Sequence, residues 1–319
     1  MVGCFQHPRA FRRNGSLALA GTMIPMKHAF AFAILIGLSL PATAQDAYVK
    51  SVDAWHADRV ARLAAEDGWL SLIGRDWLNP GENTLGSAPG STVLLPDWAA
   101  PAKAGLFLLD GATVRFRPLP GSGLLLNGKP ATEAVLVADA DGQPDVLQAG
   151  RVRFYVIRRG NRFGLRIKDP ESPVRKAFRG VPRYPVDPAW RVEADFVPYA
   201  KPQIRQIPTV LGTSEPMTAP GLLSFKVGGR EVTLDPMIED PEHPQLFLIF
   251  RDATSAHGTY AAGRFLYADM PKDGKVVLDF NRAINPPCAF TLFATCPLPP
   301  EQNQLKIAVP AGEKDPGLH

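Results

Sequence analysis

Residues 151–168 read RVRFYVIRRGNRFGLRIK, and this stretch decides the fold class. Two runs rich in apolar and basic residues flank Gly160-Asn161, a two-residue loop of the kind that joins the strands of a β-hairpin. Along residues 151–159 apolar side chains alternate with arginines, which predicts a strand with one buried and one solvent-exposed face. The stretch therefore predicts an antiparallel hairpin inside a β-rich domain.

Short apolar runs separated by turn signals continue on both sides of this hairpin. From residue 69 they recur about every ten residues, a spacing typical of a β-sandwich or barrel. Residues 169–190 hold five prolines and many charges, so we expect an irregular connector there. Strand patterns resume over residues 191–319. The sequence predicts an all-β protein with a sandwich over 69–168 and a second antiparallel sandwich or barrel domain over 191–319.

One helix is expected before the first strand, over residues 45–68. Its apolar side chains, Val52, Trp55, Val60 and Leu63, can share one face, with charged residues mostly on the other. Gly68 is expected to end the helix. We expect the apolar face of this helix to pack on a sheet, and the pattern alone assigns it no functional role.

The first 44 residues resemble an export signal. Lys27 precedes an apolar run over 29–40, and the small residues Ala42-Thr43-Ala44 follow it, as at a signal-peptidase site. The run is shorter than the ~20 residues that span a bilayer. A buried core helix is the alternative. Cleavage is expected near Ala44, which predicts a periplasmic or secreted protein, and residues 1–25 look like an upstream extension of the true start.

Charge and cysteine content exclude several classes of protein. The chain has 35 basic and 31 acidic residues, but all four cations of the signal, Arg9, Arg12, Arg13 and Lys27, are lost on cleavage. The mature chain is then neutral, which gives no support for nucleic-acid binding. No later apolar run is long enough to span a membrane. Three cysteines exclude a disulfide-dense scaffold. No phosphate-binding glycine motif, H-E-x-x-H or G-x-S-x-G motif occurs, so we expect no cofactor and no metal.

The first half resembles forkhead-associated (FHA) domains over roughly residues 80–168. The resemblance rests on Asn-Thr-Leu-Gly at 83–86, Leu-Asn-Gly-Lys at 126–129 and the Leu-x-x-Gly pattern at 147–150. FHA domains that bind phosphothreonine carry a Gly-Arg pair in the first loop and a Ser-x-x-His pattern in the next. Here the pair is Gly86-Ser87, and residues 80–168 hold no Ser-x-x-His. The resemblance therefore implies the FHA-like sandwich but not its phosphate ligand.

A second resemblance covers most of the chain after residue 67. FRDAT at 250–254, DFNRAxNPPCAF at 279–290 and ATCPLPPxxN at 294–303 are its most specific parts, and GWLSLIGRDWLNPGENTLGS at 68–87 resembles its opening. TYxAGRFLY at 259–267 and AGEK at 311–314 also match. These motifs are similar to the bacterial family known as domain of unknown function 1684. The resemblance implies a bacterial and often exported protein, and it implies no activity.

The two cysteines of the mature chain, Cys288 and Cys296, allow several interpretations. A disulfide between them suits an oxidising compartment and is the main expectation. The alternatives are metal ligation with His243 or His257, a nucleophilic Cys288 with His257 as its base, and two free buried thiols. We expect His243 in an acidic surface loop and His257 in a loop between strands, both exposed to solvent.

Polar residues at the ends of apolar strands are the best candidate site. Charges embedded in such strands are costly to bury unless they are paired, so one interpretation is a structural ion-pair network. The other is a pocket in which a free guanidinium binds a carboxylate or phosphate ester. The candidate residues are Arg251, Asp252, Arg264, Asp279, Asn281, Arg282 and Asn285.

These observations predict an exported envelope protein that binds a small anionic molecule or an envelope component. A hydrolase-like enzyme with Asp279 or Asp252 as its general base is the alternative.

Overall fold

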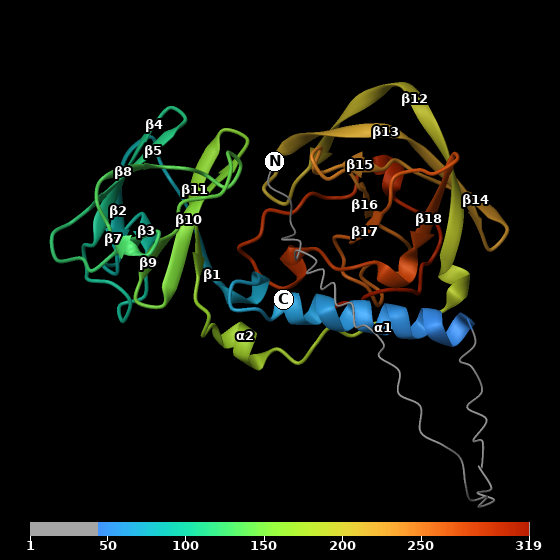
Figure 1. The fold of residues 1–319 in the computed structure, drawn as a ribbon, viewed down its shortest axis with the longest axis horizontal. Helices are drawn as coiled ribbons and strands as arrows, with labels where there is room; N and C mark the ends of the chain where they lie inside the picture. The colour runs from blue at the N-terminus through green and yellow to red at the C-terminus, as the bar shows by residue number, and fades with distance from the viewer. Residues whose placement is uncertain (1–43, 319) are drawn as a thin grey trace, which may run out of the picture.

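The computed structural model describes residues 44–318, so the predicted signal peptide lies outside the described residues apart from Ala44. The described chain forms two β-rich lobes, and one long helix lies along the second lobe (Figure 1). Strands dominate both lobes, and the helix precedes them in the chain. The prediction of an all-β protein with an N-terminal helix is confirmed.

The first lobe is a sandwich of two sheets. The larger sheet has six strands in the order β1 (Leu72–Trp77), β11 (Arg162–Lys168), β10 (Val152–Arg159), β9 (Leu147–Ala149), β6 (Leu125–Leu126) and β7 (Lys129–Pro130). The smaller sheet has five, in the order β3 (Val93–Leu94), β2 (Gly81–Gly86), β4 (Gly105–Asp110), β5 (Thr113–Pro118) and β8 (Ala134–Leu136). All pairs are antiparallel except β2 with β3.

The predicted hairpin lies at the centre of the larger sheet. Arg159 of β10 pairs with Arg162 of β11 across Gly160-Asn161, and Gly160 has a φ of +56°, which suits a tight hairpin turn. Alternate side chains of β10, including Val152 and Phe154, are fully buried between the two sheets. The period-2 pattern therefore identified the buried face of the sandwich from the sequence.

The second lobe is a single antiparallel sheet that curls toward a barrel. Its strands run in the order β17 (Arg264–Ala268), β16 (Leu246–Phe250), β15 (Met237–Ile238), β13 (Ser214–Val227), β12 (Arg191–Pro208) and β18 (Lys275–Asp279), and β14 (Arg230–Leu234) pairs with β13. The two strands at the ends of this order, β17 and β18, also contact each other. The inner face is filled by an apolar core in which Phe250 and Phe280 pack edge to face.

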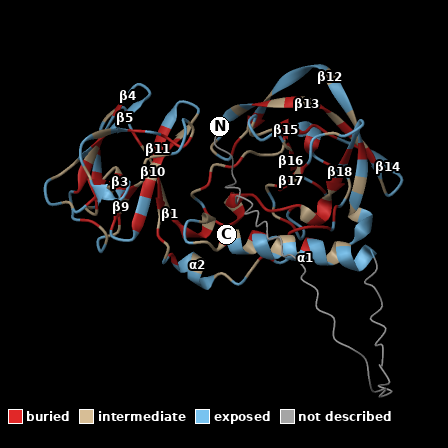
Figure 2. Cartoon of the chain, in the orientation of Figure 1, coloured by how far each residue is buried: buried red, intermediate tan, exposed pale blue. Residues whose placement is uncertain are grey.

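Helix α1 (Ala44–Leu63) packs against the second lobe although the first lobe follows it in the chain (Figure 1). Its buried residues are Val52, Arg59 and Leu63, and the outer surface of the helix is exposed (Figure 2). Leu63 lies in an apolar cluster with Phe290 of the second lobe. No helix of residues 44–318 combines the length and the apolar character needed to cross a membrane.

The connector over 169–190 contains a five-residue helix, α2 (Pro173–Ala177), and a 3-10 turn, η2 (Pro188–Trp190). The remaining short turns occur where the chain enters the first sheet and after β18. They are η1 (Trp69–Ser71), η3 (Phe280–Arg282), η4 (Pro287–Ala289) and η5 (Glu301–Asn303). The irregular chain after residue 280 therefore folds back over the second lobe, where it meets α1.

Candidate functional site

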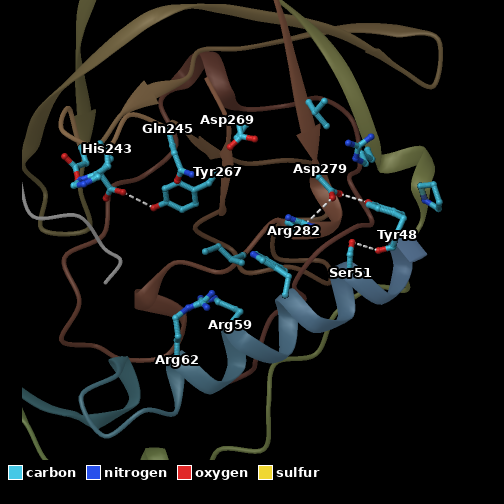
Figure 3. Close-up of a pocket in the computed structure, with 18 of the residues that line it drawn as sticks. Tyr48, Ser51, Arg59, Arg62, His243, Gln245, Tyr267, Asp269, Asp279 and Arg282 are labelled. Carbon is cyan, nitrogen blue, oxygen red and sulfur yellow. Dashed lines mark hydrogen bonds and ion pairs between the residues drawn. The ribbon is translucent and has the colours of Figure 1, made fainter. Parts of the chain in front are cut away.

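A groove of about 1260 Å³ lies between α1 and the second lobe (Figure 3). Strands β17 and β18, turn η3 and the segment after β15 form one wall, and one face of α1 forms the other. The helix lines the groove with Tyr48, Ser51, Trp55, Arg59 and Arg62, among others.

The spacing of these helix residues explains why they share a face. Steps of three and four residues return to the same side of an α-helix. From Tyr48 to Arg62 the helix rises by about 21 Å at about 1.5 Å per residue. The groove is therefore long enough for a ligand larger than a single small ion.

At one end of the groove Asp279 is the centre of a hydrogen-bond network. Tyr48 donates its hydroxyl to Asp279 Oδ1 at 2.7 Å, and the Asn281 backbone N–H donates to the same oxygen at 3.2 Å. Asn281 Nδ2 also donates to the Tyr48 hydroxyl at 2.9 Å. Burial, and then the hydrogen bond to Asp279, raise the pKa of Tyr48 well above its usual value. Tyr48 therefore stays protonated and ties the start of α1 to the end of β18.

Arg282 projects into the middle of the groove (Figure 3). Its Nε lies 3.4 Å from Asp279 Oδ2, and its guanidinium lies 5.7 Å from the centre of the Trp55 ring. The side chain remains 38% exposed. Within residues 44–318 its buried Nε finds no hydrogen-bond acceptor. Arg282 is thus held in place by one carboxylate and one ring, with its hydrogen-bonding capacity largely unused.

Two further guanidiniums line the groove. Arg62 has no carboxylate of the described chain within ion-pair distance, and neither does Arg191, whose guanidinium lies 5.9 Å from the centre of the Tyr48 ring. Arg59 differs, because it is 3% exposed, pairs with Glu313 at 3.4 Å and donates to the Asn285 carbonyl at 3.0 Å. Arg59 therefore anchors α1, whereas Arg62 and Arg191 keep their charges available.

The wall opposite Arg62 is acidic. Glu239 accepts a hydrogen bond from the Tyr267 hydroxyl at 2.9 Å, and Asp240 lies 3.1 Å from His243 Nδ1. The backbone N–H of residue 242, and then His243, lower the pKa of Asp240. Asp269 also lines this wall and is exposed. The groove therefore has guanidiniums along α1 and η3 and carboxylates along the ends of β15 and β17.

The residues predicted from sequence do not form one cluster. Asp279, Asn281 and Arg282 are together at the groove. Asn285 lies where α1 is anchored, and its backbone N–H donates to Glu313 Oε2 at 2.7 Å. Arg251 is exposed and forms an isolated β-bridge with Gln304. The structure therefore brings Asp279, Asn281 and Arg282 together and does not bring Arg251 or Arg264 to them, because burial separates these side chains into distinct surroundings.

Asp252 and Arg264 form a closed network inside the second lobe. Their side chains are 1% and 0% exposed, and Arg264 donates to Asp252 Oδ2 at 2.8 Å. The other Asp252 oxygen accepts from the backbone and the hydroxyl of Thr254, at 2.8 and 2.6 Å. Arg264 also donates to the carbonyls of Val309 and Ala311. Neither group reaches the groove, so this pair fits the structural interpretation, and Asp252 is not placed to act as a base on a bound ligand.

The cysteines are close together but not bonded. No disulfide joins Cys288 and Cys296, and the Cys288 backbone N–H lies 3.3 Å from Cys296 Sγ. His243 and His257 are both exposed, as expected. Among residues 44–318 no three His, Cys, Asp or Glu side chains are placed to hold a metal ion.

The sequence prediction missed the helix wall of the groove. It assigned Trp55 to a face packed on a sheet, and Trp55 does pack on an apolar cluster of second-lobe strand residues, but it also lies half-buried beside Arg282 at the groove. Tyr48, Trp55 and Arg62 recur at helical spacing, which could have indicated a polar-aromatic stripe. The pattern alone could not say which surface that stripe would face.

Comparison with known proteins matches the second half of the chain to a family without an assigned activity. Residues 176–314 match the model of a family described as "Protein of unknown function (DUF1684)". The match covers most of the connector and most of the second lobe, including the β-strand wall of the groove. No curated protein matches the chain.

Three solved structures are among those similar to the chain. An uncharacterized protein of Haloarcula marismortui, solved by NMR, is 31% identical with a TM-score of 0.38, over 47% of this chain and 83% of that one. An FHA domain from a study of phosphothreonine-dependent interactions is 20% identical with a TM-score of 0.21, over 30% and 92%. The FhaA FHA domain, in a complex with the intracellular domain of Rv3910, is 19% identical with a TM-score of 0.22, over 30% and 97%.

Proposed function

We propose that this protein is exported and binds a small anionic molecule, or an anionic group of an envelope component, in the groove between α1 and the second lobe. Arg282 carries the proposal, because its guanidinium is held by Asp279 and Trp55 and still offers hydrogen-bond donors to the groove. Planar guanidiniums bind carboxylates and phosphates through two parallel hydrogen bonds. Arg62 and Arg191 supply further positive charge.

The acidic wall restricts which anions fit. Glu239, Asp240 and Asp269 line the groove and would repel a ligand that is negative along its whole length. A ligand with one anionic group and hydroxyl or amino groups elsewhere suits both walls. The FHA-like lobe is not proposed to bind phosphothreonine, because Ser87 stands where such domains carry arginine.

Export is proposed from the signal pattern of residues 1–44. In an oxidising compartment we expect Cys288 and Cys296 to form a disulfide, and their contact in the reduced chain supports that expectation.

The test is to screen for binding by thermal shift and to measure affinity by calorimetry. The compounds are phosphate monoesters, short carboxylates, amino acids and any molecule that copurifies with the protein. For a ligand that binds, Arg282→Met should weaken affinity by about 10- to 100-fold, since charge-assisted hydrogen bonds contribute about 1.5–3 kcal/mol. Arg230→Met is the matched control, because Arg230 is exposed in the β13–β14 hairpin and does not line the groove. Equal affinity of wild type and Arg282→Met for every ligand found would contradict the proposal.

A further inference from the structure

The loop that carries the two cysteines lies where the two lobes meet. Arg75 of β1 donates to the Ala294 carbonyl at 2.7 Å, and Arg159 of β10 donates to the Thr295 hydroxyl at 3.0 Å. Both contacts come from the first lobe and hold the residues just before Cys296. A chemical change at this loop would therefore act directly on the contact between the lobes.

The two thiols differ in accessibility. Cys296 is 1% exposed, whereas Cys288 is only partly buried. The Cys288 backbone N–H is 3.3 Å from Cys296 Sγ, so the two residues are in contact. A partly buried cysteine beside a fully buried one suits a redox-active pair, in which the first reacts and the second resolves.

A buried cation lies beside the pair. Arg166 of β11 is 5% exposed and stacks on the Trp69 ring, with its guanidinium carbon 4.9 Å from the ring centre. Trp69 packs in the same apolar cluster as Cys288 and Cys296. In the described chain the Nε and Nη2 atoms of Arg166 reach no acceptor. Its Nη1 donates to the Tyr155 hydroxyl at 3.4 Å and lies 4.0 Å from Asp139 Oδ2. Because buried donors are rarely left unpaired, the two remaining nitrogens leave Arg166 able to stabilise a further anion beside it.

The ionisation of Cys288 agrees with this arrangement. A hydrogen bond from Cys296 lowers the pKa of Cys288, and the charges of Arg75 and Arg166 add to the effect, while burial opposes it. The Cys288 carbonyl also accepts a hydrogen bond from the Tyr260 hydroxyl at 3.2 Å, which holds this residue in place. Since the thiolate is the reacting form of cysteine, Cys288 is the thiol of the pair that is prepared to react.

We propose that Cys288 and Cys296 form a thiol–disulfide exchange site, in which Cys288 attacks a low-molecular-weight disulfide and Cys296 resolves the product. The Cys288 thiolate attacks one sulfur of the disulfide R–S–S–R, which forms Cys288–S–S–R and releases one thiolate RS⁻. Cys296 loses its proton and attacks Cys288 Sγ, which forms the Cys288–Cys296 bond and releases the second RS⁻. The two cysteines are oxidised by two electrons, and the external disulfide is reduced to two thiols.

The exchange site does not depend on the groove. Beyond the expected disulfide, it assigns Cys288 as the attacking thiol and Arg166 as a cation that favours the Cys288 thiolate. Glutathione disulfide serves as the probe, with the reduced full chain and mass spectrometry as the readout. Cys296→Ser should accumulate a mixed disulfide at Cys288, because the resolving thiol is gone. Cys288→Ser should react at least about 10-fold more slowly, because Cys296 is buried. Equal trapping in the two variants would overturn the proposal.

The role of Arg166 is tested by the pH dependence of Cys288 alkylation in the Cys296→Ser background. Arg166→Met should move the alkylation midpoint to higher pH, and Arg166→Lys should restore part of the shift. Arg162→Met is the matched control, because Arg162 lies on the same strand but stacks on Trp77 and is exposed. If Arg166→Met does not fold, the test is the pH midpoint of Cys288 alkylation in the wild-type chain. A Cys288 midpoint at or above the ordinary thiol value of about 8.5 would refute the inference.

Discussion

Replacing Arg264 by methionine should destabilise the second lobe strongly. The substitution removes the 2.8 Å ion pair to Asp252 and the hydrogen bonds to the carbonyls of Val309 and Ala311, all inside the lobe. Asp252 keeps its bonds to Thr254 but loses the only guanidinium that the described chain places on it. Stranding one partner of a buried ion pair costs about 3–5 kcal/mol. That is a large part of a total stability of about 5–15 kcal/mol.

Arg282→Met provides the comparison, because both changes remove one arginine that is paired with an aspartate. Arg282 is 38% exposed, and its contact with Asp279 is 3.4 Å long, so its loss should cost about 0–1 kcal/mol. Urea unfolding at pH 7, with both cysteines reduced, measures the two free energies of unfolding. Limited proteolysis should also cut the chain after residue 305 sooner in Arg264→Met, since Arg264 holds that segment. The reasoning fails if Arg264→Met costs under 1 kcal/mol, or if Arg282→Met costs as much as Arg264→Met.

Two further predictions concern alkaline stability and processing. The pKa of Tyr48 is raised in the folded chain, so its contribution to stability is complete below the ordinary tyrosine value of about 10 and is lost as pH rises above it. The urea concentration at the unfolding midpoint should therefore decrease as the pH is raised beyond 10. It should decrease less steeply with pH in Tyr48→Phe, and an equally steep decrease in that variant would count against this reasoning. Chain isolated from an exporting cell should begin at Gln45, and N-terminal sequencing that finds residues upstream of Met26 would exclude this cleavage site.

The acidic wall of the groove also bears on how a ligand would be selected. Arg62, Arg191 and Arg282 line the same groove as Glu239, Asp240 and Asp269. Opposed charges of this kind contribute to specificity more than to affinity, because they penalise a ligand in the wrong orientation. The groove therefore suits a ligand that binds in one direction along α1.

The sequence by itself determined the class of the fold and several of its local parts. The hairpin over 151–168, the helix before the first strand and the irregular connector follow from residue periodicity, glycine turns and proline content, which act over a few residues. The pairing of Arg159 with Arg162 was predictable, because a two-residue turn fixes the register of the strands it joins.

The tertiary structure alone decided where the candidate site lies. Tyr48 and Asp279 meet although 231 positions separate them, because α1 packs on the second lobe and not on the sandwich that follows it in the chain. The sequence could not distinguish Arg264 from Arg282, since both stand beside apolar runs. In the folded chain Arg264 is a buried structural cation, whereas Arg282 lies at the groove. Their difference is one of burial, and burial depends on which distant segments cover each side chain rather than on its neighbours in the chain.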